Sequence, residues 1–211
     1  MNLIYWVGWS FFRVTYAVYL RYRSFDSQRV PKTGPVILAS NHASILDPPL
    51  VGIGLHRVTT FLARDTLFKG AVGWLFRHWH AIPIDREGSG AAGMKRILSA
   101  LSEGRAVLLF PEGTRTRDGH LQPARSGIGL LVLKSGAPVV PVRVWGTFEA
   151  MGRGVHFPKP ERVIVKYGEP MRFTELRAEA RVCSKERLRE IYQQVADEIM
   201  AAIAKLEPRR G

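Results

Sequence analysis

Short apolar runs alternate with longer helical patterns from residue 35 onward, and no other feature restricts the possible fold as strongly. Apolar runs bounded by turn residues are typical of buried strands. Strands are predicted at 35–40, 58–63, 80–84, 106–110, 138–144 and 162–167. Helices are predicted at 47–55, 66–79, 91–104, 126–135 and 185–206. Strands separated by helices predict an α/β fold, a single domain with a mostly parallel central sheet flanked by helices.

Within a domain predicted at 26–211, the helix at 185–206 has the clearest amphipathic pattern. Its apolar residues, at spacings of three and four, are Leu188, Ile191, Tyr192, Val195, Ile199, Ile203 and Leu206. Ser184 precedes the helix and suits the N-cap, because its side-chain oxygen can accept a hydrogen bond from the first turn. This apolar stripe predicts packing against the core of the protein, not a site for a partner.

The balance of charges limits the possible partners. The 211 residues suit one domain, and a hydrophobic share of 46% excludes a disordered chain. Lys and Arg number 31 against 18 Asp and Glu, so the formal net charge is +13. Such a field attracts nucleic acid, anionic lipid headgroups, phosphorylated metabolites or acidic carrier proteins, and charge alone does not choose among them. The single cysteine, Cys183, excludes an internal disulfide and suits a reducing compartment.

Residues 1–25 predict a membrane-associating helical segment. A signal peptide is not favoured, because an early basic region and a small-residue cleavage site are missing. A transmembrane helix is not favoured either, because Arg13 at its middle would cost ~2.5 to 3.5 kcal/mol. A helix lying in the headgroup region fits best, with Trp6, Phe11, Phe12 and Arg13 expected to contact the membrane. The alternative is a helix packed on the protein's own core.

An imidazole and a carboxylate, His42 and Asp47, follow the strand predicted at 35–40. On a regular helix, five positions would place the two side chains about 140° apart. A turn that ends in Asp47 as N-cap, with Pro48 at the first helical position, can instead bend the carboxylate back toward the imidazole. His42 could then take a proton from a hydroxyl while Asp47 orients the ring. The alternative is a helix cap beside a polar loop residue.

Three further segments follow predicted strands in the same way, and each carries a short motif. They are 80–86, which ends in Ile-Asp-Arg, 110–115, which is Phe-Pro-Glu-Gly-Thr-Arg, and 137–142, which contains Val-Pro-Val. With His-x4-Asp, they resemble in order the four blocks of the glycerolipid acyltransferase family, which includes the lysophosphatidic acid acyltransferases. The resemblance covers about residues 30–170, and the first and third blocks together make it specific. His80 and Pro83 replace the glycine and the aromatic residue usual in the second block, which leaves the acceptor's identity open.

The resemblance implies an O-acyltransferase that needs no cofactor and takes acyl-CoA or acyl-carrier protein as co-substrate. His42 would be the general base on an acceptor hydroxyl and Asp47 its orienting partner, without a covalent enzyme intermediate. The default acceptor is 1-acyl-glycerol-3-phosphate, which gives phosphatidic acid; glycerol 3-phosphate, other lysophospholipids and lyso-aminolipids stay open. The residues implied to bind the acceptor's phosphate are Arg86, Glu112, Gly113, Thr114 and Arg115.

Lipid substrates imply a location at a bilayer. We therefore expect a monotopic protein on the cytoplasmic face of the inner (plasma) membrane, with lysophospholipid, acyl donor and bilayer as partners. The oligomeric state is not indicated.

Two other functions and a metal site have weaker support. Gly88–Gly93 satisfies Gly-x-Gly-x-x-Gly, typical of nucleotide-dependent oxidoreductases, but Asp85-Arg86-Glu87 separate it from its strand. A nucleic-acid-binding module would need basic residues gathered on one face with interleaved aromatics, whereas Lys and Arg are scattered here. His78-Trp-His80 is poor ligand geometry by itself, so no metal is predicted.

Overall fold

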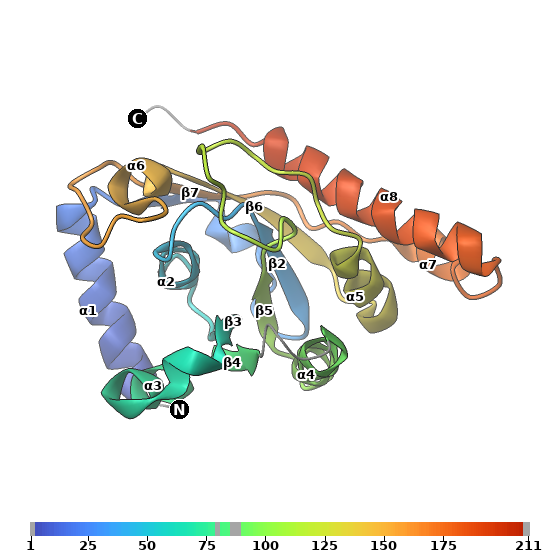
Figure 1. The fold of residues 1–211 in the computed structure, drawn as a ribbon, viewed down its shortest axis with the longest axis horizontal. Coiled ribbons are helices and arrows are strands. Elements are labelled where there is room, and N and C mark those ends of the chain that lie inside the picture. Colours follow the sequence, from blue (N-terminus) through green and yellow to red (C-terminus); the bar gives the residue numbers. More distant parts are fainter. Residues whose placement is uncertain (1–2, 79–80, 85–89, 209–211) are drawn as a thin grey trace.

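The computed structural model describes residues 3–78, 81–84 and 90–208, and its helices lie on both faces of one sheet (Figure 1). In the described residues the sheet has seven strands in the order β1–β7–β6–β2–β5–β3–β4. The strands are β1 (Arg23–Phe25), β2 (Val36–Ser40), β3 (Thr59–Arg64), β4 (Ala81–Ile84), β5 (Ala106–Leu109), β6 (Val139–Trp145) and β7 (Ile164–Tyr167). All neighbouring strands are parallel except the antiparallel pair β6–β7, which confirms the predicted α/β fold.

The helices confirm most of the predicted positions. They are α1 (Leu3–Tyr19), α2 (Asp47–Ile53), α3 (Gly70–His78), α4 (Gly90–Ser102), α5 (Gly127–Ser135), α6 (Thr147–Met151), α7 (Thr174–Glu179) and α8 (Lys185–Ala204), with 3₁₀ turns η1 (Ser27–Arg29) and η2 (Asp65–Phe68). The helix predicted at 66–79 is wrong as one element, because Gly70 adopts a φ of +56° at the junction of η2 and α3. The elements β1, α6 and α7 are missing from the prediction, since three to six residues are too few to show a period.

The two faces of the sheet carry separate apolar cores. Along β2, Val36 and Leu38 enter one core, whereas Ile37 and Ala39 enter the other, as expected for side chains that alternate along a strand. Side chains of α1 and α2 complete the first core. Side chains of α4, α5 and α8 complete the second, so these helices cover the opposite face of the sheet (Figure 1).

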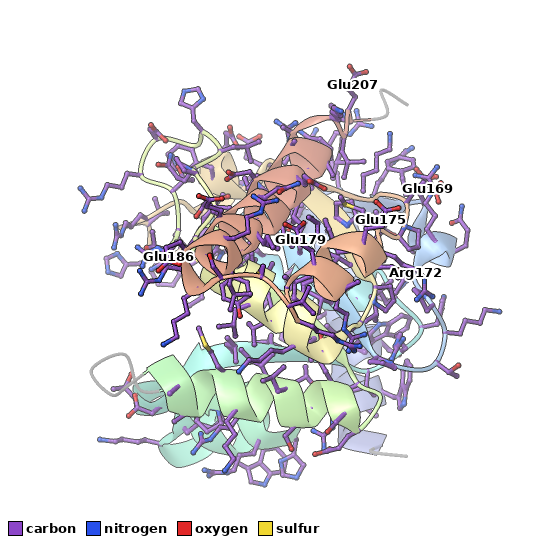
Figure 2. The ribbon with its side chains drawn as sticks, turned by 90° about the vertical axis from the view of Figure 1, so that its right-hand side faces the viewer. Glu169, Arg172, Glu175, Glu179, Glu186 and Glu207 are labelled. Atoms are coloured by element: carbon purple, nitrogen blue, oxygen red, sulfur yellow. The ribbon has the colours of Figure 1, made fainter. Side chains whose placement is uncertain are left out.

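The final helix, α8, packs on the second core. Ile191, Val195, Ile199 and Ile203 are fully buried, which confirms the core-packing interpretation of the stripe. The N-cap prediction is also confirmed, because the Ser184 hydroxyl accepts a hydrogen bond from the backbone N–H of Arg187 at 3.2 Å. Charged side chains of both signs cover the outer surface of α7, α8 and the segments beside them (Figure 2).

Helix α1 packs one face on the protein and leaves the other exposed. Tyr16 contacts the first core, together with Trp9 and Phe12. Phe12 and Arg13, which were expected to contact the membrane, are half-buried and make contacts with the protein: Phe12 packs on the first core, and Arg13 Nη1 donates a hydrogen bond to Ile53 O at 2.8 Å. Burial of the Tyr16 hydroxyl raises its pKa to about 12. Among the described residues, no helix is long and apolar enough to cross a membrane.

Helices α5 and α8 approach so closely at Gly129 that a side chain does not fit. A Cβ there would lie 2.0 Å from the backbone oxygen of Tyr192, whereas one at Gly127 would meet only Met94 Cε at 3.5 Å. We expect Gly129→Ala to lower the free energy of unfolding by on the order of 1 to 3 kcal/mol, because the helices must separate. Gly127→Ala is the matched control and should be neutral or slightly stabilising. Equal urea midpoints for the two variants would contradict this packing.

Candidate active site

The His42 turn begins where strand β2 ends, at the carboxyl edge of the sheet. Strand β2 lies between β5 and β6 and is parallel to both, so the three carboxyl ends meet there. Asn41 fixes the exit of the chain from the sheet, because its side chain pairs with the backbone of Val144 in β6. Asn41 Nδ2 donates to Val144 O at 3.0 Å, and Val144 N donates to Asn41 Oδ1 at 2.8 Å. The turn therefore starts from a fixed point.

His42 and Asp47 form the contact that the sequence predicts. His42 Nδ1 lies 2.8 Å from Asp47 Oδ2, and the same oxygen accepts hydrogen bonds from the N–H groups of Ala43 at 2.7 Å and Ser44 at 2.8 Å. Asp47 is fully buried, whereas the His42 side chain is 18% exposed. The backbone N–H groups of the turn thus fix the carboxylate in a position where it contacts the imidazole of His42.

The predicted role of Asp47 as N-cap is wrong. Asp47 is the first residue of α2, and Leu46 occupies the cap position without a side-chain cap hydrogen bond. The Asp47 carboxylate bends back to the N–H groups of the preceding turn instead of forward into the helix. The carboxylate therefore closes the turn and does not cap α2. The first turn of α2 contains Pro48 and Pro49, which have no N–H group and so need no capping partner.

The imidazole of His42 is held in one plane and one tautomer. Its ring stacks on Phe110, with centroids 3.8 Å apart and planes 15° from parallel. The contact with the Asp47 carboxylate places the ring proton on Nδ1, since a carboxylate accepts hydrogen bonds and does not donate them when ionised. The second nitrogen, Nε2, is then free to accept a proton from a bound hydroxyl.

The backbone of His42 is held by the loop that follows β5. The N–H of His42 donates to Glu112 Oε1 at 3.2 Å, and the N–H of Thr116 donates to His42 O at 2.8 Å. Glu112 is 3% exposed, and its burial raises the pKa of the carboxyl from its ordinary 4.5 to about 7, with the charge of Asp47 adding to the effect. Hydrogen bonds from the backbone of His42 and Gln122 act in the opposite direction.

Glu112 is therefore buried against the backbone of His42, where its carboxyl group can position that residue. Gly113 and Arg115 reach the surface of the same loop. Gly113 has a φ of +70°, which favours glycine, and a Cβ would lie 2.9 Å from Arg125 Cδ. Arg115 is half-buried, as is Thr114, and the described residues offer Arg115 no ion pair or hydrogen bond. Arg86, the fifth residue implied to bind phosphate, lies outside the described residues.

The end of α2 is held as firmly as its start. Four side chains, from α1, the segment between α1 and β1, and β7, donate to carbonyl groups at or just beyond the end of the helix, where intrahelical partners run out. The pairs are Tyr22 Oη–Leu50 O at 2.8 Å, Tyr167 Oη–Val51 O at 2.6 Å, Arg13 Nη1–Ile53 O at 2.8 Å and Trp9 Nε1–Leu55 O at 3.1 Å. Burial raises the pKa of both tyrosines, so they stay neutral donors. Helix α2, which carries Asp47, is therefore fixed at both ends.

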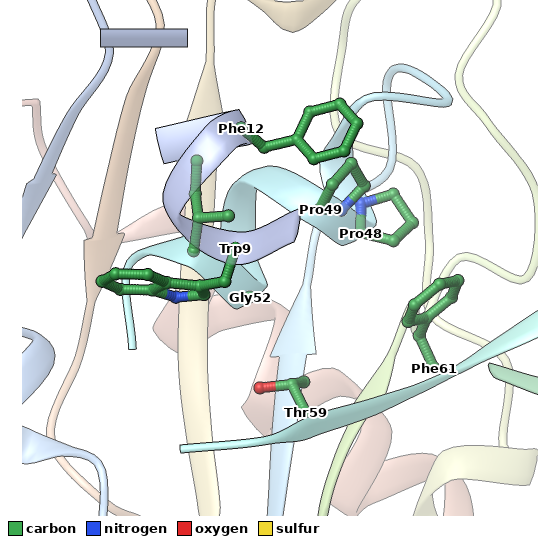
Figure 3. A pocket seen from close by; sticks show the side chains of 8 residues that line it. Trp9, Phe12, Pro48, Pro49, Gly52, Thr59 and Phe61 are labelled. Carbon is green, nitrogen blue, oxygen red and sulfur yellow. The ribbon is translucent and has the colours of Figure 1, made fainter. Parts of the chain in front are cut away.

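An apolar cavity lies beside the two prolines that follow Asp47 (Figure 3). Its walls come from α1, α2 and β3, which approach from three sides. The lining residues are Trp9, Phe12, Pro48, Pro49, Gly52, Ile53, Thr59 and Phe61. The cavity measures about 40 Å³. Its chemistry suits a hydrocarbon chain and not a charged ligand.

The two motifs with weaker support are the histidine pair at 78 and 80 and the glycine motif at 88–93. Among the described residues, no group of three or more His, Cys, Asp or Glu side chains could hold a metal ion. His78 pairs Nδ1 with Trp74 O at 2.8 Å within α3, whereas His80 lies outside the described residues. Residues 85–89 of the Asp85–Gly93 segment also lie outside the described residues, and Gly90 begins α4.

Sequence reasoning missed three residues that hold the His42 turn. Asn41 is adjacent to His42, and a polar residue directly after an apolar strand is the only signal that could have indicated it. Phe110 is predicted as the last residue of a strand, whereas in the structure it follows β5 and its ring stacks on the imidazole of His42. Thr116 directly follows the Glu-Gly-Thr-Arg motif, and its N–H contact with His42 depends on the order of strands in the sheet.

A family model described as Acyltransferase matches residues 21–145 of this chain. The 1-acyl-sn-glycerol-3-phosphate acyltransferase of Limnanthes douglasii is 33% identical over 145 residues, which are 64% of this chain and 50% of that protein. The enzyme of the same name from Bacillus subtilis (strain 168) is 28% identical over 166 residues, or 78% and 79% of the two chains. The match thus spans half or less of the plant relatives' length.

A solved structure has the same fold. It is the crystal structure of the 1-acyl-sn-glycerophosphate (LPA) acyltransferase PlsC from Thermotoga maritima, with a TM-score of 0.73 and 24% sequence identity. The alignment covers 96% of this chain and 81% of that chain. At this level of identity the likeness concerns the fold alone.

The raised pKa of Glu112 makes stability depend on pH. Between about pH 4.5 and 7 the folded state binds more protons than the unfolded state, so ionisation of Glu112 lowers the free energy of unfolding as pH rises. Glu112→Gln keeps the acceptor for the His42 N–H without a titrating group. Relative to this variant, we expect the wild type to lose roughly 2 to 4 kcal/mol between pH 4.5 and 8, measured by urea unfolding. A difference that does not change with pH would contradict the raised pKa.

Proposed function

Because this chain belongs to the acyltransferase family, we propose that it transfers a fatty acyl group from an acyl thioester to the hydroxyl of a lysophospholipid. The observation that carries the proposal is the contact of His42 with the buried Asp47 at the carboxyl edge of the sheet. The names of its relatives favour 1-acyl-sn-glycerol-3-phosphate as the acceptor, with phosphatidic acid as the product. Other acceptors of the same class remain the second candidate.

The proposed reaction needs no covalent bond to the protein. His42 Nε2 takes the proton of the acceptor hydroxyl as the oxygen attacks the thioester carbonyl carbon. The tetrahedral intermediate then collapses, the carbon–sulfur bond breaks, and the leaving thiolate receives the proton from the imidazolium. Asp47 stabilises that imidazolium through the Nδ1 contact. Cys183 lies far along the chain beside the second core, so the single cysteine of the protein is not placed to act as a nucleophile.

Arg115 and the backbone of Gly113 are the proposed phosphate contacts. A guanidinium that has no partner among the described residues can form two parallel hydrogen bonds with a phosphate. The exposed Gly113 has no side chain to block the approach of a phosphate, although its own N–H donates to Phe110 O at 3.0 Å. Thr114 lies between them. Arg86 is kept as a proposal from the resemblance alone. Glu112 takes a different role from the one expected, because a buried carboxylate against a phosphate would repel it, whereas its contact with the His42 N–H supports the catalytic turn.

The apolar cavity between α1, α2 and β3 is the proposed place for an acyl chain. It adjoins Pro48 and Pro49, which follow the catalytic Asp47, and all its walls are apolar except Thr59. Helix α1 forms one wall of the cavity and is hydrogen-bonded to α2 through Arg13 Nη1 and Ile53 O, so a movement of α1 away from α2 would enlarge the cavity for an acyl chain.

The acyl donor and the location are proposals of the same kind. Both acyl-CoA and acyl-carrier protein are acidic, which suits a chain with a net charge of +13. We propose a monotopic protein at the cytoplasmic face of the inner membrane, with the exposed face of α1 in contact with lipid. Phe11 is 64% exposed and Trp6 is half-buried, so these two remain candidate membrane contacts. Neither an oxidoreductase nor a nucleic-acid-binding module gains support from the site.

The function is tested by the loss of activity in dyad variants. With labelled acyl-CoA and a panel of lysolipid acceptors, we expect His42→Ala to lower kcat by at least about 10²-fold, the lower end for general-base catalysis. Asp47→Asn should also be severe, because it removes the charge that stabilises the imidazolium. His120→Ala, an exposed histidine on a neighbouring loop, is the control. More than about a tenth of the activity in folded His42→Ala would contradict the assignment.

The phosphate contact is tested by a pair of neighbouring arginines. Arg115→Ala should chiefly raise the KM for a phosphorylated acceptor, with a smaller effect on the donor, because a phosphate contact contributes uniform binding. Arg117→Ala, an exposed arginine two residues further on, should change this KM far less. Equal losses with phosphorylated and non-phosphorylated acceptors would show that Arg115 has another role.

A further inference from the structure

The loop 152–160, between α6 and β7, exposes two large apolar side chains. Phe157 is 84% exposed and Val155 is 39% exposed. Pro158 and Pro160 follow Phe157 and restrict the backbone there. Single exposed apolar residues are common on soluble proteins and need no explanation. The position of this loop relative to α1 is what distinguishes Phe157 from such residues.

The loop is fixed to the end of α1. Tyr19 Oη, at the last residue of α1, donates a hydrogen bond to Pro158 O at 2.8 Å, and Arg21 Nη2 donates to Pro160 O at 3.4 Å. A backbone hydrogen bond from Lys159 N to Ala150 O, 2.8 Å long, connects the loop to α6. Phe157 is therefore presented by a held loop beside the end of α1, although the two segments are far apart in sequence.

Helix α1 itself carries an exposed apolar stripe. Val7, Phe11, Val14 and Val18 are 61% to 77% exposed and follow one another at spacings of four, three and four, so they lie on one face of the helix. The stripe and the loop thus extend each other: the stripe runs toward Tyr19, and Tyr19 contacts the loop. Figure 1 places the loop after α6 at the same end of α1.

The charges around the surface suit an anionic partner. Arg153 and Lys159 are exposed on either side of Phe157, and Arg21 lies at the α1 end of the loop. Residues 152–160 contain no Asp or Glu, and neither do residues 1–25; the half-buried Glu161 follows the loop, and the exposed Glu149 precedes it in α6. Basic residues that surround exposed aromatic and aliphatic side chains are the pattern by which proteins bind anionic bilayers from one side.

We propose that loop 152–160 is a second bilayer-inserting element, with Phe157 entering an anionic lipid surface beside the exposed stripe of α1. A second anchor beside the α1 stripe would restrict how the protein tilts on the bilayer, so this surface would orient the protein and not merely attach it. The loop also adjoins the candidate active site, because Ser44 Oγ, two residues after His42, donates to Met151 O at 2.6 Å directly before the loop. Insertion of Phe157 would then bring the catalytic turn to the lipid surface.

This inference extends the membrane docking of α1 proposed above, and its test measures binding without acyl transfer. Its failure is therefore distinguishable from failure of the catalytic assignment. The chain also supplies a matched control. Val182 is 86% exposed, close to the 84% of Phe157, but it lies in the turn between α7 and α8, beside helices that cover the opposite face of the sheet from α1.

Insertion is read directly from a fluorescent label. In a Cys183→Ser background, Phe157→Cys, Phe11→Cys and Val182→Cys each receive one environment-sensitive NBD group. With vesicles of phosphatidylcholine and phosphatidylglycerol, we expect a blue shift and an intensity increase at 157 and 11 and none at 182. No change at 157, with a change at 11, would overturn the proposal while leaving α1 as the only anchor. Changes at 182 equal to those at 157 would overturn it too.

The contribution of Phe157 to membrane binding is measured by co-sedimentation of the full chain with vesicles. Phe157→Ser should weaken partition to the anionic vesicles by at least about tenfold, the lower end expected for withdrawing a phenyl ring from an apolar environment. Val182→Ser should leave partition unchanged. The double variant Arg153→Gln/Lys159→Gln should lose roughly tenfold or more on anionic vesicles and little on pure phosphatidylcholine. Equal partition of wild type and Phe157→Ser would overturn the proposal.

Discussion

The buried carboxylate of Asp47 is the constraint on which the candidate site depends. A charged group without solvent is costly unless hydrogen bonds satisfy it, and here one oxygen receives two backbone N–H groups and faces the Nδ1 atom of His42. Those bonds close the turn after β2 and set the direction of the imidazole. The Phe110 ring and the loop from Glu112 to Thr116 then hold the same histidine from its other sides.

Helix α2 transmits this constraint to the rest of the protein. It carries Asp47 at its start, and at its end it accepts hydrogen bonds from α1, from Tyr22 directly before β1, and from β7. The two faces of α1 have different surroundings. The Arg13 guanidinium donates a hydrogen bond to the carbonyl of Ile53, whereas the apolar stripe on the other face of the helix is exposed. The helix proposed to contact lipid and the helix that carries the proposed catalytic carboxylate are thus joined by a hydrogen bond, so a shift of α1 would displace α2.

Much of the fold could be predicted because buried strands of a parallel sheet are continuous apolar runs, and amphipathic helices have a period of their own. The stripe of α8, with Ser184 as its cap, is the clearest case. The same rule placed His42 and the loop from 110 to 115 at one edge of the sheet. Short elements such as β1 and α6 were not predicted. The N-cap role predicted for Asp47 was wrong, because a carboxylate next to a turn can accept hydrogen bonds from N–H groups on either side of it.

The alternation of strands and helices, the His-x4-Asp contact and the family resemblance could be predicted because each depends on residues close together in the chain. Roles that depend on distant partners became visible only in the folded structure. It turned Arg13 and Phe12 toward the protein, placed Glu112 beneath the His42 backbone, and set the Phe157 loop against the end of α1. The physical reason is that buried polar groups take whichever donors and acceptors the packed sheet brings near them, and local sequence does not record which segments those are.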